Sequence, residues 1–566
     1  MPHPLPSSGA RSGGPAGPGV QRRGRRRSRR RTAVALSGAV ALALVAACSG
    51  PPATGPSGAA ALQLSAGTPA AKGDLASFSW GLYAEPPTLD YIYAFDYEQN
   101  MILSNVCESL MRWTPQLKEE PGLAQDVQTP NPTTFVYDLR PGVHFHDGSV
   151  MTADDAVYSL NRQLDPSLGS YWIQSFQNVA SITKTGPLQV TVKLKRPDAL
   201  FPQYMATAAG VIAGEKGIRA AGKNYGTSGS LDCTGPYKLG TWTKGQSVEL
   251  DRFDGYWGTR AKSGKVTFDF LTDPSALTNA LLSGEVDGSY LIPTESYSRL
   301  KSSGVGTLYF GEGLTTVNVN VTNLKGPLGD VRVRRALSMA LDRTGFVRTG
   351  LAGVGTVSNS VSPRAAWNLA NPETRKAALD DLPSAAQNLD QARALIKAAG
   401  ATGKTVTIAT SPIGQDVSLL ATAVQSAGTQ IGLNVQLKTI APNAYTALFS
   451  DPKARAGLDM FPETYYLSVT DPMDVLSNFE TGGFQNYAGF SDPAYDKLVQ
   501  QALSTYDPAG RLAVEARLQK IVADQVTWIP AAEWPTGLFL NKRITGAPTT
   551  ISYLYYPWAA DVGAAG

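Results

Sequence analysis

The chain has 566 residues, with 50 Lys or Arg against 46 Asp or Glu, and its formal net charge at pH 7 is +4. Nine of the arginines and none of the acidic residues lie within residues 1–47, so the remainder has 41 basic and 46 acidic residues and a net charge of −5. This acidic balance removes the argument for a nucleic-acid-binding surface. The part after residue 73 exceeds what one hydrophobic core usually holds, which predicts two or three domains.

Residues 1–47 have the pattern of a secretory signal. An arginine cluster at 22–31 precedes sixteen mostly apolar residues at 32–47, too few to span a bilayer comfortably as a helix. Cys48 follows the small residues Ala46 and Ala47, and this arrangement resembles the lipobox of bacterial lipoproteins, in which the cysteine thiol receives diacylglycerol. An ordinary signal peptide with an incidental cysteine is the alternative, and "SRRR" also resembles a twin-arginine export signal. We expect cleavage after residue 47, lipidation of Cys48 and a location on the outer side of the cell membrane.

Residues 48–73 are expected to be a lipidated cysteine followed by a disordered tether. The segment is almost entirely Gly, Pro, Ser, Ala and Thr, which cannot bury enough apolar area to order. A flexible chain of this length reaches roughly 25–30 Å. No second apolar stretch of spanning length follows, so lipid is the only membrane attachment that the sequence suggests.

The body alternates strands with helices, which predicts an α/β fold. Alternating apolar residues predict strands at 134–145, 188–195, 405–410 and 433–440. Helices are expected after Thr152 as N-cap, over 389–400 with Gly400 as the stop, and after Ser491 as N-cap. The two cysteines that remain, Cys107 and Cys233, suggest a disulfide in an exported protein, with two buried thiols as the alternative.

The sequence contains little that indicates catalysis or metal binding. His144 and His146 share a strand face beside Asp147, but no further histidine follows to complete a metal site, and a strand end packed into a turn is the better interpretation. There is no nucleophile elbow, no phosphate-binding loop and no dinucleotide fingerprint. We therefore expect no enzyme, no metal and no cofactor.

Aromatic residues are the more informative feature. "LYAEPPTLDYIYAFDYEQN" includes Tyr91 and Tyr93, and "FPETYYLSVTDP" includes Tyr465 and Tyr466. Aromatic rings beside Asp, Asn and Gln in loop-like segments suit a cleft that stacks on a polar ligand. Ordinary core packing explains them equally well on composition alone.

Several segments together resemble one family, the extracellular solute-binding proteins of the peptide/nickel class (family 5) that feed ABC importers. The similar blocks, in order between about residues 78 and 535, are "EPPTLDYIYAFDYEQNMILSNVCESLMRW", "TTFVYDLRPGVHFHDGSVMTADDAVYSLNR", "CTGPYKLGTW" followed by "DGYWG", and "GDVRVRRALSMALDR". The resemblance explains His146 and Asp147 as part of a structural turn. It implies a protein that performs no chemistry and traps a ligand by hinge closure.

The resemblance also implies a two-lobed class II periplasmic-binding-protein fold with an extra domain in the first lobe. Mapped by the motifs, lobe I would comprise residues 75–105, 232–315 and 525–566, the extra domain residues 106–231, and lobe II residues 316–524. Expected partners are a small solute and ABC permease subunits with their cytoplasmic ATPase, with the protein itself a monomer.

The ligand is where the sequence departs from the family pattern. Dipeptide-type members carry Trp-x-x-Asp before an Asp-Pro, where this chain has Tyr465 and Ser468 before Asp471. Their arginine for the peptide carboxylate is also missing from "TSPIGQD". A buried ammonium facing serine loses a charge-assisted hydrogen bond of roughly 1.5–3 kcal/mol, which disfavours a tight clamp on dipeptide ends.

We expect an importer receptor for peptides, oligopeptides in particular. The proposed ligand-binding residues are Tyr465, Tyr466, Ser468, Asp471, Tyr91 and Tyr93. An oligosaccharide or other polar solute, a signalling role in place of transport, and an exported hydrolase are the alternatives.

Overall fold

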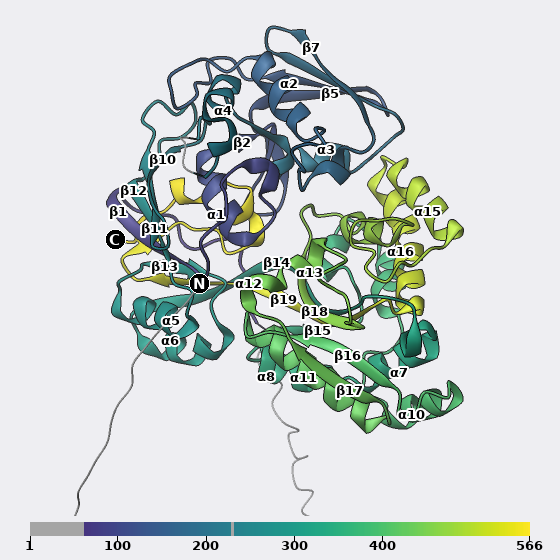
Figure 1. The fold of residues 1–566 in the computed structure, drawn as a ribbon. Coiled ribbons are helices and arrows are strands. Elements are labelled where there is room, and N and C mark those ends of the chain that lie inside the picture. The colour runs from purple at the N-terminus through teal and green to yellow at the C-terminus, as the bar shows by residue number, and fades with distance from the viewer. Residues whose placement is uncertain (1–61, 228–230) are drawn as a thin grey trace, which may run out of the picture. The chain divides into compact units, whose positions relative to one another are not determined.

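The computed structural model describes residues 62–227 and 231–566, so the expected signal peptide and Cys48 lie outside the described residues. One eleven-stranded sheet runs through the body, in the order β10–β11–β12–β1–β13–β19–β14–β18–β16–β17, with β15 paired to β19 (Figure 1). In that order the bounds are Tyr237–Thr243, Ser247–Arg252, Ser263–Phe270, Leu75–Leu82, Gly288–Tyr290, Trp528–Asn541, Gly306–Val321, Met460–Tyr466, Thr405–Thr410 and Asn434–Thr439, with β15 at Thr356–Val357.

Two long strands, β14 and β19, connect the two ends of this sheet. We call the part built on β10, β11, β12, β1 and β13 the first lobe, and the part built on β18, β16 and β17 the second lobe. The β14–β19 ladder is interrupted between Gly311 and Thr315, where Leu314 has a φ of +47°. The expected lobe boundary between 315 and 316 therefore falls inside β14, beside this irregularity.

A separate four-stranded sheet is inserted in the first lobe. Its order is β5–β6–β8–β7, with bounds Ala124–Asn131, Thr134–Leu139, Gln189–Leu194 and Val179–Gly186. Phe135, Tyr137 and Leu139 alternate into the core as their spacing predicts. The expected strand to residue 145 is too long, because the chain turns directly after Leu139 and Gly142 takes a φ of +75°. Three short pairs complete the strands, namely β2 (Glu108–Ser109) with β9 (Val211–Ile212), β3 (Met111–Trp113) with β4 (Glu119–Pro121), and β20 (Ile544–Thr545) with β21 (Gly563–Ala564).

Helices cover both lobes and the inserted sheet (Figure 1). In the first lobe and its insertion they are α1 (Tyr97–Val106), α2 (Ala153–Arg162), α3 (Phe201–Tyr204), α4 (Glu215–Ala221), α5 (Pro274–Ser283) and α6 (Tyr297–Ser303). In the second lobe they are α7 (Val331–Ala340), α8 (Arg343–Gly350), α9 (Pro372–Arg375), α10 (Leu389–Ala398), α11 (Gln415–Gln430), α12 (Pro442–Tyr445), α13 (Ala447–Ser450), α14 (Met473–Leu476), α15 (Pro493–Leu503) and α16 (Pro508–Gln525). Among the described residues, no helix is long and apolar enough to cross a membrane.

Local sequence signals explain where these helices begin and end. Thr152 caps α2 in a capping box with Asp155, as expected from the sequence. Gly400 follows α10 with a φ of +62°, the conformation expected of a glycine stop. The N-cap of α15 is Asp492 and not Ser491, because the Asp492 carboxylate accepts the backbone N–H of Ala494.

The chain already contacts the folded body before residue 73, where we expected the free tether to end. The backbone N–H groups of Ser65, Thr68 and Lys72 donate to the carbonyl oxygens of Phe310, Ala547 and Ala564. Low apolar content does not prevent this order, since the extended segment is held by backbone hydrogen bonds to the body and not by a core of its own. The expectation of a free tether up to residue 73 is therefore wrong for residues 65–72.

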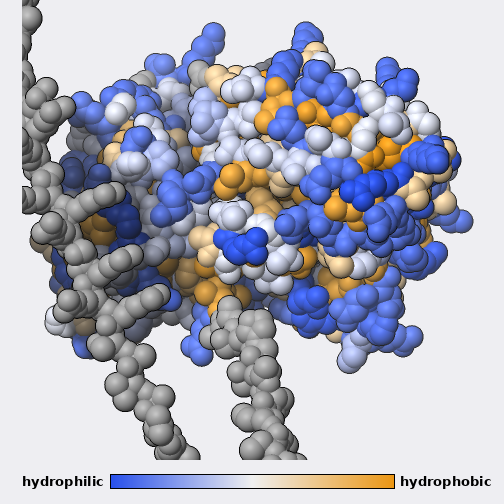
Figure 2. Space-filling view, turned by 90° about the horizontal axis from the view of Figure 1, so that it is seen from below, coloured by the Kyte–Doolittle hydropathy of each residue, from blue (hydrophilic) through white to orange (hydrophobic). Residues whose placement is uncertain are grey.

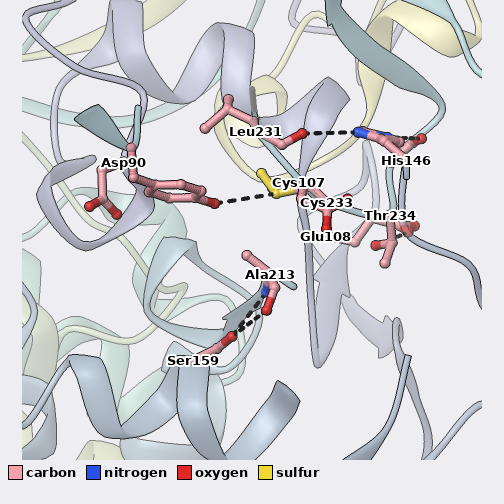
Figure 3. The surroundings of a disulfide bond; sticks show 12 residues. Asp90, Cys107, Glu108, His146, Ser159, Ala213, Leu231, Cys233 and Thr234 are labelled. Atoms are coloured by element: carbon pink, nitrogen blue, oxygen red, sulfur yellow. Dashed lines mark hydrogen bonds between the residues drawn. A yellow bond between two sulfur atoms is a disulfide. The ribbon is translucent and has the colours of Figure 1, made fainter. Parts of the chain in front are cut away.

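Cys107 and Cys233 form a disulfide, with 4.9 Å between their Cα atoms (Figure 3). Cys107 is the C-cap of α1, and Cys233 follows the inserted segment that contains β2 to β9. The bond therefore fastens the start and the end of the insertion to each other. The backbone N–H of His146 also donates to the carbonyl of Cys233, 2.9 Å away, which adds a third segment to this junction.

The surface shows no large apolar face in the view from below. Figure 2 shows a face that is mostly hydrophilic, with apolar residues in dispersed patches. Such scattered exposure is normal for globular proteins and marks no docking site.

Candidate ligand-binding cavity

A cavity of about 260 Å³ lies between the two lobes. Its first-lobe wall is formed by Phe95, Asp96, Tyr97, Tyr171, Trp172, Gln174, Ser175, Gln177, Asp198, Leu200 and Tyr204. Its second-lobe wall is formed by Phe449, Glu463, Thr464, Tyr465, Tyr466, Ser468, Asp474, Ser477, Asn478, Glu480, Thr481, Gly482, Gly483, Phe484, Gln485 and Leu503. Aromatic rings and short polar side chains alternate on both walls, which is the composition of a site for a polar ligand.

The start of α1 positions the first-lobe wall. Asp96 is the N-cap of this helix, and its carboxylate accepts the Tyr97 N–H at 2.8 Å and the Tyr83 hydroxyl at 3.2 Å. Phe95 stacks on Tyr171 with 3.8 Å between ring centroids, so the aromatic wall is rigid. The cap therefore places one carboxylate and its neighbouring aromatic rings at the cavity together.

The end of β18 positions the second-lobe wall. Glu463, Tyr465 and Tyr466 belong to this strand, and the chain then turns toward α14. Asp474 in α14 accepts the backbone N–H of Ser468 through Oδ2 at 2.7 Å, which fixes the loop that carries Ser468. Asn478 donates to the hydroxyl of Tyr465 at 3.1 Å and holds that ring in place.

Direct contacts join the two walls. Tyr204 donates its hydroxyl to Asp474 Oδ1 at 3.0 Å, and the backbone N–H of Ala199 donates to the Leu503 carbonyl at 2.8 Å. Tyr466 donates its hydroxyl to the Phe95 carbonyl, and the Tyr171 ring meets the Phe484 ring edge-on at 5.6 Å. These contacts join the two walls of a cavity that stays partly open.

Negative charge dominates the lining. Five carboxylates line the cavity, from Asp96, Asp198, Glu463, Asp474 and Glu480, while no Lys, Arg or His stands among the described lining residues. Burial raises the pKa of Asp474 to about 7 and that of Glu463 to about 8. Burial also raises the pKa of Asp96, Asp198 and Glu480 above the ordinary range.

Three of the residues proposed from the sequence line the cavity. Tyr465 and Tyr466 present their rings to it, and Ser468 lies beside them at the end of β18. Tyr465 and Ser468 were found by counting back from Asp471-Pro472, and Tyr466 by the aromatic density of the same segment. That motif alignment therefore located the second-lobe wall.

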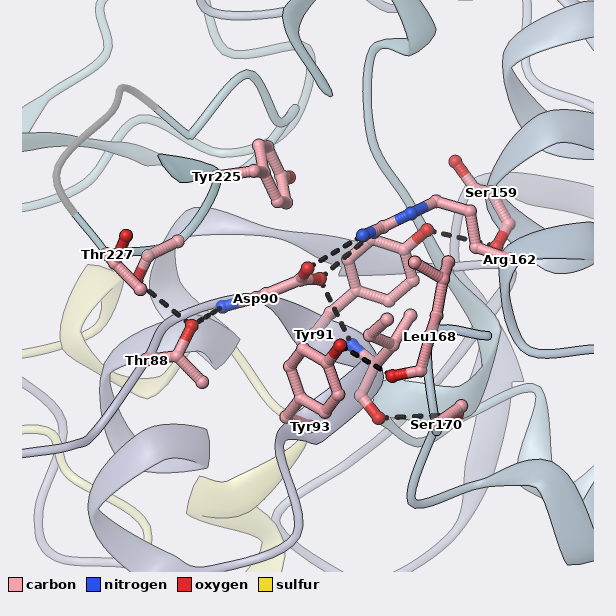
Figure 4. A network of polar contacts seen from close by, with 12 residues as sticks. Thr88, Asp90, Tyr91, Tyr93, Ser159, Arg162, Leu168, Ser170, Tyr225 and Thr227 are labelled. Atoms are coloured by element: carbon pink, nitrogen blue, oxygen red, sulfur yellow. Dashed lines mark hydrogen bonds and ion pairs between the residues drawn. The ribbon is translucent and has the colours of Figure 1, made fainter. Parts of the chain in front are cut away.

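The other three proposed residues lie away from the cavity and stabilise the fold. Asp471 is buried, and its carboxylate accepts Arg511 Nη2 at 2.7 Å and Arg511 Nε at 3.0 Å. Tyr91 donates its hydroxyl to the Ser159 carbonyl at 3.0 Å, and Tyr93 donates to the Leu168 carbonyl at 2.6 Å (Figure 4). Their polar groups are satisfied inside the protein, so the structure does not place them where a ligand in this cavity would contact them.

The same part of the first lobe contains a buried ion pair. Arg162 at the end of α2 binds both oxygens of Asp90, at 3.0 and 2.7 Å, across 72 residues of chain (Figure 4). Its guanidinium also lies 5.1 Å from the centre of the Tyr91 ring. Two of the sequence blocks that carry the family resemblance therefore meet at this pair.

His146 belongs to a structural turn. Its ring nitrogens lie 3.0 Å from the Gly235 carbonyl and 3.4 Å from the Leu231 carbonyl, and burial lowers its pKa to about 4 (Figure 3). The ring meets Phe253 edge-on at 5.1 Å. His144 has a different neighbour, with its Nδ1 3.0 Å from the Gly142 carbonyl.

Several lining residues were missed from the sequence. Tyr171, Asp96, Glu463 and Asp474 all line the cavity. Asp96 was visible as a helix cap, and Asp474 follows the Asp-Pro motif at a distance of three residues. Nothing in the local sequence indicates that Tyr171 in the insertion faces Glu463 in the second lobe.

A family model described as bacterial extracellular solute-binding proteins, family 5 Middle, matches residues 118–487. The chain belongs to the bacterial extracellular solute-binding proteins, family 5. Family 5 relatives include the glutathione-binding protein GsiB of Escherichia coli (strain K12), which is 24% identical over 469 residues and is matched over 81% of this chain and 89% of its own length.

Solved structures resemble this family 5 protein along most of its length. The binding protein DppA of Helicobacter pylori, in complex with the peptide STSA, has a TM-score of 0.78 and 19% identity over 88% of this chain and 99% of its own. The oligopeptide-binding protein AppA of Bacillus subtilis, in complex with a nonapeptide, has a TM-score of 0.76 and 20% identity over 87% and 100%. The fold is the α/β, two-lobed class II periplasmic-binding-protein fold. At the level of the family, the members are solute-binding proteins and not enzymes.

Proposed function

We propose that this family 5 protein is the lipid-anchored receptor of an ABC importer and that it captures peptides in the cavity between its lobes. The observation that carries the proposal is the aromatic cavity between the lobes, whose walls come from segments as distant as Asp96 and Asp474. Closure of two lobes around a ligand buries it and gives the permease a distinct shape to recognise. The peptides named with DppA and AppA, and the glutathione in the name of GsiB, support a peptide-like ligand.

The size of the cavity favours a short peptide. Its volume of about 260 Å³ lies just below the ~300–1,000 Å³ typical of ligand pockets. Longer peptides need the lobes to open further or the chain to emerge between them. The interruption of the β14–β19 ladder at Gly311–Thr315 offers a place for such bending.

Binding is tested by thermal shift on the full chain, with dipeptides, tripeptides, longer peptides and saccharides as separate panels. A ligand at 100 times its Kd should stabilise the folded state by about 2.7 kcal/mol. Stabilisation by peptides supports the proposal. Stabilisation by saccharides alone, or by nothing in any panel, contradicts it.

A matched pair of tyrosine variants tests the site. Tyr465→Ala removes a ring from the cavity, and Tyr158→Ala removes a half-buried ring that packs on Arg219 far from it. We expect the first variant to lose at least about tenfold in peptide affinity while the second keeps the affinity of the parent. Equal affinity for both variants contradicts the placement of the site.

The anchor is tested at Cys48. In a bacterial host, the parent should incorporate a labelled fatty acid and sediment with membranes, because a lipidated cysteine holds the chain at the membrane surface. Cys48→Ala should remove the label and release the protein. Membrane retention of the unlabelled variant contradicts anchoring through Cys48.

Delivery to a transporter has its own test. Reconstitution of the receptor with its permease and ATPase in vesicles should give uptake of the bound peptide that depends on ATP. A receptor that binds peptide but never stimulates uptake or ATP hydrolysis by the transporter favours the signalling alternative.

A further inference from the structure

The five cavity carboxylates differ from other buried carboxylates of the protein in their partners. Asp90, Asp471 and Asp287 each form an ion pair with an arginine, namely Arg162, Arg511 and Arg543. None of the five cavity carboxylates forms an ion pair with any described residue. The described part of the protein therefore supplies no cationic partner to these five carboxylates.

Neutral donors alone serve the two most buried of these carboxylates on the second lobe. Asp474 accepts the Tyr204 hydroxyl and the Ser468 N–H. Glu463 accepts the Tyr487 hydroxyl at 3.2 Å and the Asn320 amide. Such donors orient a carboxylate but do not balance its charge, so burial favours the protonated form until a cation approaches.

Neutral donors by themselves do not mark a ligand site. Glu108, away from this cavity, accepts Tyr256, Trp257 and Thr234 and is satisfied as a structural group. Glu108 borders only a cavity of about 20 Å³, whereas Asp96, Glu463 and Asp474 border the cavity of about 260 Å³, in which a ligand fits.

These carboxylates reach the cavity from both lobes and share its lining with the rings of Tyr171 and Tyr465. Burial raises the pKa of Tyr171, and the charges of Glu463 and Asp96 add to this rise. Burial likewise raises the pKa of Tyr465, with Asp474 and Glu463 contributing. The negative charge therefore surrounds an aromatic surface, the combination that attracts organic cations.

The nearest arginines lie behind the lining and are engaged elsewhere. Arg196 donates to the Asn178 side chain at 2.7 Å, although its charge reaches Asp198 and Glu480. Arg455 donates to the Leu448 carbonyl and lies 4.9 Å from the centre of the Tyr487 ring, and its charge reaches Glu463. Neither borders the cavity, so neither can bind an anionic group of a ligand there.

We infer that the ligand carries net positive charge, with an ammonium or guanidinium group held among Asp96, Glu463 and Asp474. This inference rests on the proposed function, because it assigns a charge class to the ligand of the same cavity. It disfavours acidic ligands, including glutathione, for this chain. The cation is a basic side chain of the peptide, because a terminal ammonium is offset by the terminal carboxylate and gives no net positive charge.

Isothermal titration of the full chain with three tripeptides tests the inference. The probes are Ala-Lys-Ala, its neutral analogue with norleucine in the centre, and Ala-Glu-Ala. We expect the lysine peptide to bind about 10- to 100-fold more tightly than the neutral analogue, and the glutamate peptide to bind most weakly. Equal affinities for the lysine and norleucine peptides, or tighter binding of the glutamate peptide, overturn the charge inference while leaving peptide binding intact. If none of the three tripeptides binds and no peptide of the wider panel stabilises the protein, the proposed function is overturned instead.

N-acetylated versions of the same peptides test whether the basic side chain or the terminal ammonium is the group held. Retention of the lysine preference after acetylation supports the inference. Loss of binding of both the lysine and norleucine peptides on acetylation overturns it, because the terminal ammonium then accounts for the binding. Tight binding of the acetylated norleucine peptide, which has no cation, overturns the inference.

Charge-removing variants provide the structural test. Asp474→Asn and Glu463→Gln each keep the shape of the side chain, and each should reduce the lysine preference about tenfold or more. Asp154→Asn, at a carboxylate that is 62% exposed and away from the cavity, should keep the full preference. Melting curves of all three identify any variant that fails to fold, and two independent cavity variants keep the test decisive. An unchanged preference in both folded cavity variants overturns the inference.

Discussion

Asp90 and Asp474 are both buried carboxylates, but the fold gives them different partners. Asp90 binds Arg162 through two hydrogen bonds inside the first lobe (Figure 4). Asp474 borders the cavity and accepts only a tyrosine hydroxyl and a backbone N–H. The first arrangement fixes two segments of the fold with their charges balanced. The second keeps a charge available and leaves its compensation to a ligand, so the comparison separates residues that hold the fold from residues that select a ligand.

The largest effect on stability is expected where a balanced charge loses its partner. Arg162→Met leaves Asp90 buried without a cation and should lower the free energy of unfolding by about 3–5 kcal/mol. Urea denaturation monitored by circular dichroism measures this change. The double variant Asp90→Asn/Arg162→Met should recover part of the loss, because no charge is then left unpaired. If the Arg162→Met variant is as stable as the parent, the Asp90–Arg162 ion pair does not stabilise the fold. The distinction between paired and unpaired buried carboxylates is then contradicted.

The disulfide should contribute a similar or slightly smaller amount by a different mechanism. Cys107 and Cys233 are 126 residues apart, so the bond restricts a long loop of the unfolded chain. Replacing both with alanine should lower the free energy of unfolding by about 2–5 kcal/mol. The measurement is urea denaturation of the variant beside the oxidised and reduced parent. The reduced parent and the variant should have the same free energy of unfolding. A reduced parent that is as stable as the oxidised parent would contradict the expectation.

The pH dependence of the free energy of unfolding should reflect the raised pKa values of the cavity carboxylates. The pKa values of Asp474 and Glu463, about 7 and about 8, lie above the ordinary 3.8 and 4.5 of the unfolded chain. Between those values the folded protein binds more protons at these two groups than the unfolded chain does, so their contribution to stability is largest near pH 4 and falls as pH rises toward 8. Asp474→Asn should remove its share of the decline, on the order of 1–3 kcal/mol.

Thermal unfolding at pH 5, 6, 7 and 8 measures this slope. The matched control is Asp154→Asn, which alters an exposed carboxylate and should keep the slope of the parent. A saturating cationic ligand should flatten the parent's slope, because it stabilises the ionised carboxylates. An Asp474→Asn slope identical to that of the parent would show that this carboxylate is not strained by its burial.

The smallest effect is expected at an exposed ion pair. Lys184 Nζ and Asp154 Oδ2 are 2.7 Å apart, and the two side chains are 43% and 62% exposed. Water and salt screen such a pair, so Lys184→Gln should change the free energy of unfolding by about 0–0.5 kcal/mol. Urea denaturation of parent and variant in low and high salt checks this. A loss above about 1 kcal/mol would mean that the surface also depends on charge balance.

The second-lobe wall was more accessible from sequence than the first-lobe wall. Tyr465, Tyr466 and Ser468 stand at fixed distances before Asp471-Pro472, and a motif with fixed spacing carries through one strand into one loop. Tyr91 and Tyr93 look equally suitable in sequence, but their hydroxyls are used by the Ser159 and Leu168 carbonyls. Composition cannot distinguish an aromatic ring that faces a cavity from one that faces the core.

Asp471 shows a second limit of prediction from the sequence, namely which carboxylate is paired with a cation. As the acidic residue of an Asp-Pro motif it was a reasonable candidate for a ligand contact, yet Arg511 from α16 takes its carboxylate. Asp474, three residues later, has no arginine partner among the residues that the structure describes and borders the cavity. Which of two nearby carboxylates is balanced depends on a helix that lies 40 residues away in the chain.

The sequence alone determined the α/β class, the family, the helix caps at Thr152 and Gly400, and three residues of the cavity, because these follow from local periodicity, capping chemistry and fixed motif spacing. It also showed that the positive formal charge belongs to the first 47 residues. Only the tertiary structure decided that residues 65–72 pack on the body and that five carboxylates meet at one cavity with no cation among its described lining residues. Burial and partner choice are properties of side chains brought together from distant segments, and local sequence carries no signal for them.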